Sequence, residues 1–106
     1  MVKIELRQNR LVAFLEGELT FYNSSEIKEQ IKRAITGNEE QLILEFSGLT
    51  MIDSSGVGII ISLLKKMNGK DLVVVAPPPK IARVLEITRI DQIVPIASTL
   101  DEAYQK

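Results

Sequence analysis

Cysteine and histidine are both missing from this chain. Without cysteine there can be no disulfide and no thiolate nucleophile, and without either residue a Cys/His zinc site cannot form. The lack of histidine also removes the imidazole base of a Ser-His-Asp hydrolase. Since the chain has no Gly-rich phosphate loop, EF-hand or dinucleotide-binding motif, we expect no metal and no cofactor.

An excess of one charge and long apolar runs are also missing. Thirteen Lys and Arg stand against fourteen Asp and Glu, giving a net charge of −1 with no basic block, so neither nucleic acid nor a membrane is expected as a partner. The apolar stretches fall well short of the ~20 residues that a membrane-spanning helix needs. The start, Met1-Val2-Lys3-Ile4-Glu5, has no secretory leader pattern. The expected location is therefore the cytoplasm.

The chain does contain enough apolar material for a core. Its 106 residues are 45% hydrophobic and 25% charged, a balance typical of a folded globular protein. That length suits one domain, and no linker, repeat or low-complexity tract interrupts it. We expect residues 1–106 to form a single domain.

The first third of the chain predicts a β-hairpin followed by a helix. Apolar residues alternate at positions 2, 4 and 6 and recur over 11–15, with the polar segment 8–10 between them, and Gly17 closes the second strand. Apolar residues at helical spacing then predict a helix over Ser24 to Thr36. Asn23 and Glu26 have the spacing of a capping box, and Gly37 suits a helix end that needs a positive φ.

The middle of the chain predicts a buried strand, a loop and a long apolar helix. The run Leu42 to Phe46 suits a central strand covered by helices on one or both faces. Residues 49–52 are expected to form a loop that leads to Asp53, a suitable N-cap. The helix that follows is expected to stop at Asn68-Gly69.

The last third predicts two more strands and two more helices. A buried strand over 72–76 is stopped by Pro77-Pro78-Pro79, whose last member suits the first turn of a helix extending through Ile87. A short strand over 93–96 is expected at the sheet edge, because proline has no N–H for a ladder. Ser98 and Thr99 begin two overlapping capping boxes for a terminal helix.

The element order is therefore ββαβαβαβα. Strands that alternate with helices favour an α/β fold, with about four helices on a mixed, mostly parallel sheet and one antiparallel pair from the N-terminal hairpin. In such sheets functional groups gather at the carboxyl ends of strands. The turn after Phe46 is consequently the first place to look for function.

That turn carries Asp53, Ser54, Ser55 and Gly56. An acidic or hydroxyl side chain before an apolar helix is commonly only an N-cap, so these four residues alone indicate little about function. Gly56 and Gly58 strengthen the indication, because each costs a helix ~1 kcal/mol relative to alanine and leaves bare backbone beside the serines. We expect another group to approach closely there.

Two apolar residues of the following helix are candidates for contact with a partner. At about 100° per residue, one helix face holds Val57, Ile60, Ile61, Leu64 and Met67. Ile59 and Leu63 fall outside that face. If they are exposed, they form together with the turn a surface patch suited to a protein partner. The equally weighted alternative is that they are buried in a wider core stripe. Their solvent exposure in the structure decides between the two.

These residues resemble a known family. The segment Asp53-Ser54-Ser55-Gly56-Val57-Gly58 resembles the Asp-Ser-(Ser/Thr)-Gly-(Leu/Val)-Gly signature of STAS-domain anti-sigma factor antagonists. Gly17-Glu18-Leu19 is similar to the family's Gly-Glu-(Leu/Ile)-Asp, and residues 81–90 are similar to its Arg-containing helix that ends in Leu-x-x-(Thr/Ser)-Gly-Leu. The resemblance covers essentially the whole chain.

The resemblance implies a switch component and not an enzyme. In that family the serine corresponding to Ser54 is phosphorylated by an anti-sigma factor that is also a serine kinase. The unphosphorylated form binds that partner and releases a sigma factor, and a PP2C-type phosphatase resets the phosphorylated form. We expect a monomer or weak dimer whose partner-binding residues are Thr20, Asp53, Ser54, Ser55, Gly56, Gly58, Ile59 and Leu63.

The chain departs from the family pattern at three places. Thr20 replaces the usual Asp, which removes a carboxylate from the expected site. Arg89 replaces the usual Gly after Thr88, where a positive φ would cost ~1 kcal/mol, so a differently shaped corner is expected. The three prolines at 77–79 are also more than the family usually has.

Three other functions compete with the one that the resemblance implies. A phosphoaspartate receiver would use Asp53, but the first strand ends in Arg7-Gln8 where a receiver needs an acidic pair. An enzyme pairing Ser54 with Lys65 or Lys66 lacks any evident oxyanion donors. A STAS scaffold or sensor module in another signalling complex is the remaining alternative.

Overall fold

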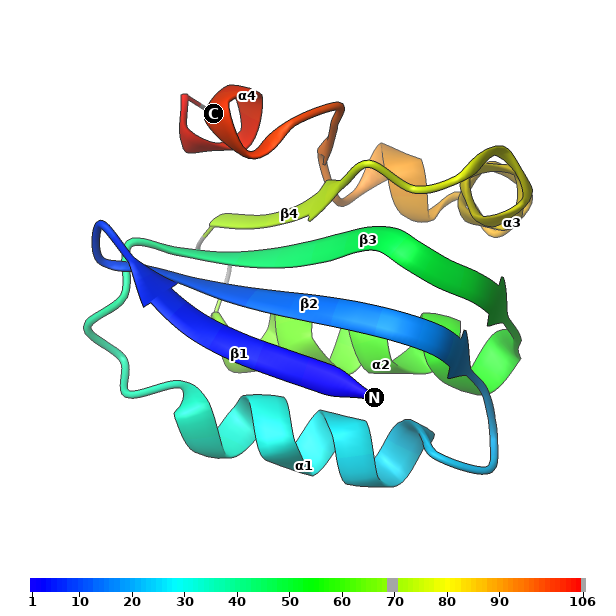
Figure 1. The fold of residues 1–106 in the computed structure, drawn as a ribbon, viewed down its shortest axis with the longest axis horizontal. Coiled ribbons are helices and arrows are strands. Elements are labelled where there is room, and N and C mark those ends of the chain that lie inside the picture. Colours follow the sequence, from blue (N-terminus) through cyan, green and yellow to red (C-terminus); the bar gives the residue numbers. More distant parts are fainter. Residues whose placement is uncertain (69–70, 106) are drawn as a thin grey trace.

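The computed structural model describes residues 1–68 and 71–105, and the chain has the expected order and an α/β fold. Five strands form one mixed sheet in the order β1-β2-β3-β4-β5, with β1 antiparallel to β2 and the other pairs parallel (Figure 1). The elements are β1 (Val2–Arg7), β2 (Arg10–Leu19), α1 (Ser24–Ala34), β3 (Gln41–Ile52), α2 (Ser54–Lys66), β4 (Asp71–Val75), α3 (Pro79–Ile87), the 3-10 helix η1 (Ile90–Gln92), β5 (Ile96–Ala97) and α4 (Leu100–Tyr104).

The opening hairpin is confirmed. Gln8 and Asn9 form its turn, with φ of 51° and 64°. Two successive left-handed residues match the right-handed twist of the flanking strands. This tight turn places β1 at one edge of the sheet.

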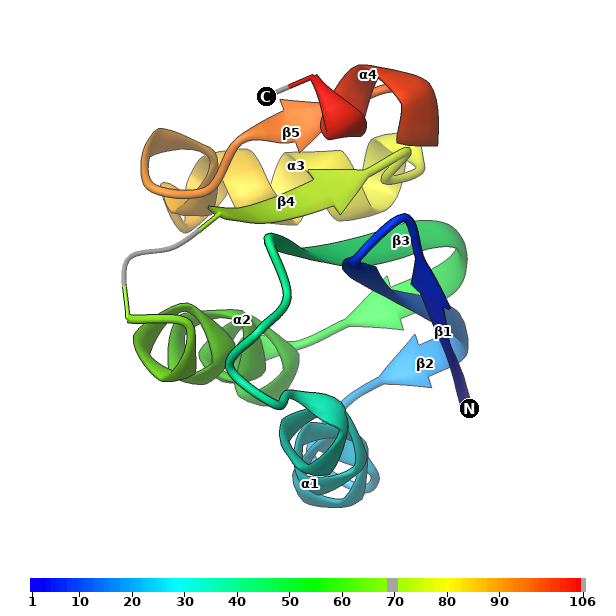
Figure 2. The ribbon, with the colours of Figure 1, turned by 90° about the vertical axis from the view of Figure 1, so that its left-hand side faces the viewer.

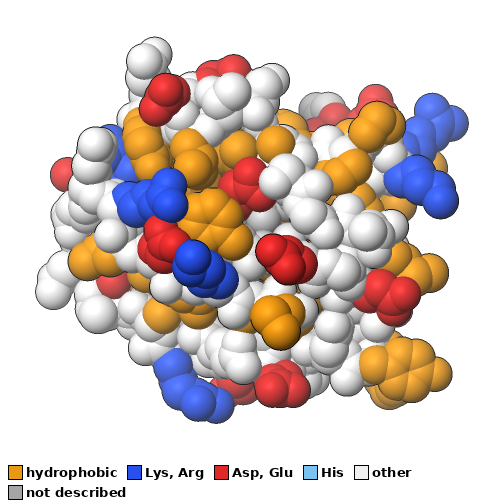
Figure 3. All heavy atoms as spheres, in the orientation of Figure 1, with side chains coloured by type: hydrophobic (Ala, Val, Ile, Leu, Met, Phe, Trp, Pro, Cys, Tyr) orange, Lys and Arg blue, Asp and Glu red, His pale blue; other side chains and the backbone are white. Residues whose placement is uncertain are grey.

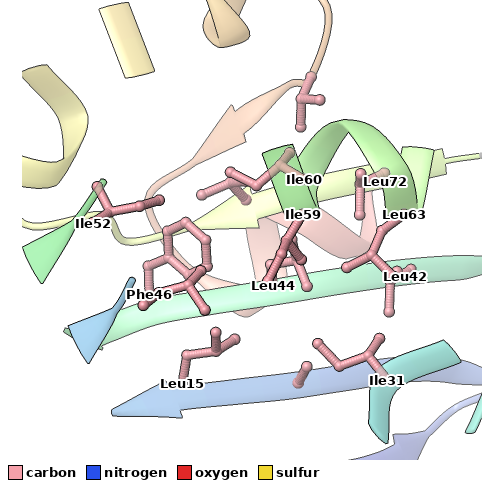
Figure 4. Packing of buried hydrophobic residues seen from close by; sticks show 14 of the residues in the cluster. Leu15, Ile31, Leu42, Leu44, Phe46, Ile52, Ile59, Ile60, Leu63 and Leu72 are labelled. Carbon is pink, nitrogen blue, oxygen red and sulfur yellow. The ribbon is translucent and has the colours of Figure 1, made fainter. Parts of the chain in front are cut away.

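The helices cover both faces of the sheet, as Figures 1 and 2 show. On one face α1 and α2 lie side by side and bury alternate residues of β2, β3 and β4, including Leu15, Leu44 and Phe46 (Figure 4). A smaller cluster on the other face contains Ile43 and Val73 and is covered in part by α4. Burial on both faces explains the nearly continuous apolar runs of the central strands.

Two strands extend further than expected. The second strand continues past Gly17 to Leu19, because an irregularity in the register at Gly17, with φ of 78°, lets pairing resume beyond it. The third strand continues through the expected loop over 49–52, where Leu49 pairs with Gly17 and Ile52 pairs with Leu19. These extensions bring the carboxyl ends of β2 and β3 together, directly before α1 and α2.

The predicted position of the start of α1 is confirmed, but the predicted capping of the helix by the Asn23 side chain is wrong. Asn23 makes no side-chain cap. Its Oδ1 accepts a hydrogen bond from the Thr20 N–H at 3.0 Å, and its Nδ2 donates to the Glu18 carbonyl at 2.7 Å. The side chain therefore closes the preceding loop, and the capping box with Glu26 does not form.

The end of α1 comes earlier than expected, at Ala34 instead of Thr36. The Thr36 N–H donates to the Glu39 carboxylate at 2.8 Å, so that carboxylate holds the chain in a loop. Gly37 has the expected positive φ, 97°, but it lies in this loop beyond the helix end.

The later elements mostly follow the prediction. Pro79 occupies the first turn of α3, and the Thr99 side chain caps α4 by accepting from the Glu102 N–H at 3.1 Å. The last strand is at the sheet edge but spans only Ile96–Ala97, after Pro95. The expected stop at Asn68-Gly69 is described only at Asn68, which is left-handed with φ of 56°; Gly69 lies outside the described residues.

Arg89 adopts a backbone conformation that favours glycine. Its φ is 63° and its ψ is 21°, which is the left-handed region. We expected the corner to avoid a positive φ because an arginine stands there, and the structure shows the positive φ instead. The arginine therefore bears the strain, ~1 kcal/mol for a residue with a Cβ.

Among residues 1–68 and 71–105, no helix combines the length and apolar character needed to cross a membrane.

Candidate functional site

Asp53 lies at the carboxyl end of β3 and connects the β2–α1 loop to the start of α2. It is the N-cap of α2, where its Oδ1 accepts from the Gly56 N–H at 3.1 Å, and its Oδ2 accepts from the Phe21 N–H at 2.9 Å. The hydrogen bond from Phe21 is the main reason that the pKa of Asp53 is lowered. Asp53 is thus a fixed negative charge that ties the β2–α1 loop to the start of α2.

Ser54 is the first residue of α2 and is exposed to solvent. Within the described part of the chain its hydroxyl makes no hydrogen bond, while the neighbouring Ser55 is half-buried. Free N–H groups and the helix dipole at such a position tolerate a negative group. Ser54 therefore lies at the surface, at a helix N-terminus that can accept a negative charge.

The two glycines of the turn have different surroundings. A Cβ on Gly56 would lie 2.5 Å from the Leu19 carbonyl oxygen and 2.6 Å from Cγ1 of Ile52. The close approach expected at Gly56 is therefore made by the chain itself, where the end of β2 packs against α2. A Cβ on Gly58 would meet nothing within 4 Å, and this residue is exposed. Only Gly58 offers bare backbone to a partner.

Of the two alternatives for Ile59 and Leu63, burial in a wider core stripe is the one that the structure shows, and their prediction as partner-binding residues is not supported. Ile59 is 5% exposed and Leu63 is fully buried, whereas Ile61, assigned to the core face, is exposed. The reason is that α2 packs against α1 as well as the sheet, so its buried stripe is wider and turned toward α1 (Figures 2 and 4). Neither residue is available to a partner in this conformation.

Thr20 is also buried, with 7% of its surface exposed. Its N–H binds Asn23, and its carbonyl accepts from the Asn23 and Ser24 N–H groups at 3.1 and 2.8 Å. The residue therefore shapes the loop beside Asp53, and its side chain presents little surface to a partner. In the described part of the chain, no group of three His, Cys, Asp or Glu side chains could hold a metal ion.

Comparison with known proteins agrees with this architecture. The profile of the STAS domain family matches residues 1–103. The chain belongs to the STAS domain family. An anti-sigma F factor antagonist from Paenibacillus polymyxa is 31% identical over 100 residues, which cover 90% of this STAS domain and 86% of that protein.

Solved structures show the same fold. The crystal structure of a candidate anti-sigma factor antagonist from Thermotoga maritima has a TM-score of 0.91 and 26% identity, covering 98% of this chain and 92% of that one. The Bacillus cell fate determinant SpoIIAA in its phosphorylated form has a TM-score of 0.74 and 24% identity, covering 99% and 97% of the two chains.

Sequence reasoning missed the most exposed side chains beside the site of this STAS domain. Phe21 is 75% exposed and Tyr22 is 94% exposed, and their rings pack edge to face with centroids 5.9 Å apart. The sequence does contain one indication of these exposed side chains, since the chain has only five Phe and Tyr residues and two of them are adjacent in a polar loop. Exposed aromatic residues are typical anchors of protein interfaces.

Proposed function

We propose that this STAS domain is an anti-sigma factor antagonist that works in the cytoplasm. Its unmodified form binds an anti-sigma factor with serine kinase activity and so releases a sigma factor. Phosphorylation of Ser54 switches that binding off. The observation that carries the proposal is the exposed Ser54 hydroxyl at the start of α2, beside the fixed carboxylate of Asp53 and the exposed aromatic pair.

The proposed modification uses ATP held by the partner. The Ser54 oxygen attacks the γ-phosphorus, the bond between that phosphorus and the bridging oxygen of ADP breaks, and a base of the kinase takes the hydroxyl proton. A PP2C-type phosphatase then hydrolyses the phosphoserine with water and restores the hydroxyl. This STAS domain supplies only the acceptor, so it acts as a substrate and switch and not as an enzyme.

The charge of the phosphate provides the switching free energy. A phosphoserine carries about −1.5 to −2 charges. In the free protein this charge faces water at a helix N-terminus, but in a complex it is desolvated beside Asp53. An added cost of ~3 kcal/mol weakens association by about a hundredfold. Supporting this use of the fold, SpoIIAA has been solved in both unphosphorylated and phosphorylated forms.

Titration calorimetry with the cognate anti-sigma factor tests the switch. We expect Ser54→Glu or Ser54→Asp to weaken binding by about tenfold to a hundredfold, Ser54→Ala to bind and resist phosphorylation, and all three variants to keep the wild-type circular dichroism spectrum. Ser98→Glu, which changes an exposed serine before α4, is the matched control and should bind normally. Unchanged affinity of Ser54→Glu, or phosphosite mapping that finds Ser54 unmodified by the kinase, would contradict the proposal.

A further inference from the structure

A groove of about 480 Å³ lies between the end of β3 and the helix α3. Its apolar lining consists of Met51 and Ile52 from β3 and of Ile81 and Val84 from α3. Met51 is 51% exposed and Val84 is half-buried, while Ile52 and Ile81 form the buried floor. A volume of this size can take one or two aliphatic or aromatic side chains.

The charged residues of the groove are both cations. Lys80 and Arg83 line it, are exposed, and stand three residues apart on α3, so they lie on the same side of the helix. Among residues 1–68 and 71–105, neither of them forms an ion pair and no carboxylate lines the groove. Lys80 is also in the first turn of α3, where the helix dipole disfavours a cation. Figure 3 shows basic side chains beside apolar ones at the upper right, where Figure 1 places α3.

The groove adjoins the candidate functional site. Ile52 lines the groove and directly precedes Asp53, and its side chain packs beneath Gly56 at the start of α2. A protein that covers Ser54 therefore has the groove within reach on one side and the aromatic loop of Phe21 and Tyr22 on the other. The apolar floor can hold an uncharged anchor, and the two unpaired cations complement negative charge.

We infer that the groove receives an acidic segment of the anti-sigma factor, with an apolar side chain seated against Met51 and Val84 and carboxylates facing Lys80 and Arg83. The inference rests on the proposed function and adds the chemistry of the partner. Contact with Lys80 and Arg83 gives the complex an electrostatic component that weakens with salt. Phosphorylation of Ser54 then acts next to this contact and not through it.

Charge reversal tests the electrostatic part. We expect Lys80→Glu/Arg83→Glu to weaken binding of the cognate anti-sigma factor by tenfold or more and to flatten the dependence of affinity on salt. The matched control is Lys65→Glu/Lys66→Glu, which makes the same change of net charge on exposed residues at the end of α2 and should change affinity less than threefold. An acidic residue at position 80 suits the first turn of a helix, so the variant is expected to fold.

Photocrosslinking tests the partner segment itself. A photoreactive phenylalanine analogue at Val84 should capture a stretch of the anti-sigma factor that contains an apolar residue flanked by Asp or Glu, as identified by mass spectrometry of the crosslinked peptide. Capture of a basic stretch, or equal effects of the two charge-reversal pairs, would overturn the inference and leave the Ser54 switch standing. Absence of binding by wild type and Ser54→Ala alike would overturn the proposed function and this inference together.

Discussion

Asp53 connects the start of α2 to the loop that lies beside it. Its two carboxylate oxygens accept from the N–H group of Phe21 in the β2–α1 loop and from that of Gly56 in α2. An N-cap alone would use only the second of these hydrogen bonds. The first one fixes the loop that presents the aromatic pair, so the cap also sets the shape of the surface around Ser54.

The glycines of α2 predict opposite responses to alanine. Gly56→Ala should lower the free energy of unfolding by about 1–3 kcal/mol, because its Cβ would lie too close to the Leu19 carbonyl, which cannot move freely. Gly58→Ala should raise it by about 0.5–1 kcal/mol, because the Cβ enters open space in a helix. Urea unfolding of both variants measures the difference. Equal destabilisation by the two substitutions would refute this reading of the turn.

Glu39 predicts an acid-sensitive contribution to stability. It is 7% exposed, and although burial opposes its ionisation, hydrogen bonds from the Thr36 hydroxyl and from the Thr36 and Gly37 N–H groups lower its pKa from 4.5 to about 2. Because the folded-state pKa is the lower one, the stabilisation is present above pH 4.5 and is lost as the pH falls toward 2.

Substitution at this position should therefore act mainly above the acid range. We expect Glu39→Gln to lower the free energy of unfolding by about 2 kcal/mol at pH 7 and to have a much smaller effect near pH 2. Thermal unfolding across this pH range measures the effect, with the exposed Glu29→Gln as control. A loss that is the same at pH 7 and at pH 2 would argue against the carboxylate as its source.

At the scale of elements, the short helix α4 is held by polar contacts as well as by packing. The buried Gln41 donates from Nε2 to the Ala103 carbonyl at 2.8 Å and accepts at Oε1 from Arg10 Nε at 3.2 Å. Arg10 also donates to the Tyr104 carbonyl at 3.2 Å and lies 4.8 Å from the centre of the Tyr104 ring. The start of β2 and the start of β3 are thus both connected to the last helix.

Removing this connection should open α4 locally. Gln41→Ala leaves the Ala103 carbonyl without its donor, at a cost of about 2 kcal/mol. We expect the amide hydrogens of α4 to exchange at least tenfold faster while those of β3 stay protected. Hydrogen exchange followed by NMR makes the comparison, and the exposed Gln30→Ala is the control. Unchanged exchange in α4 would show that packing alone holds the helix.

The elements also show what periodicity can and cannot establish. Apolar spacing was sufficient for the element order and for the central strands, because parallel strands buried on both faces have no ambiguous side. It was insufficient for α2, since a helix that packs against a sheet and another helix buries a stripe that depends on both neighbours. Ile59 and Leu63 were misplaced for this reason.

The candidate site could be predicted where it depends on residues close together in the sequence, and it could not be predicted where it depends on residues far apart. Asp53 and Ser54 follow from a short motif at a strand-to-helix turn, and the structure puts them there. The hydrogen bond from Phe21 and the close approach of the Leu19 carbonyl to Gly56 come from the loop after β2 and from the end of β2, more than thirty residues earlier in the chain. No local pattern encodes such contacts, and the groove between β3 and α3 likewise needs the assembled fold.

At the scale of the whole molecule, the features proposed for binding lie together at the carboxyl ends of the parallel strands β2 and β3. The aromatic loop, Asp53 and Ser54, and the basic groove follow one another along that edge. The polar contacts that hold α4 and the loop containing Glu39 lie at the amino ends of these strands. The features proposed for binding and these structural contacts are therefore at opposite ends of the strands.

The tight contact between Gly56 and Leu19 has one more consequence. The first turn of α2 packs on the backbone of β2 with no space for a Cβ at Gly56, so it has no room to move inward. If Ser54 is phosphorylated as proposed, we therefore expect the added charge to act at the surface and not through a change of the core. A partner would then have to contact the phosphoserine directly to distinguish the two forms.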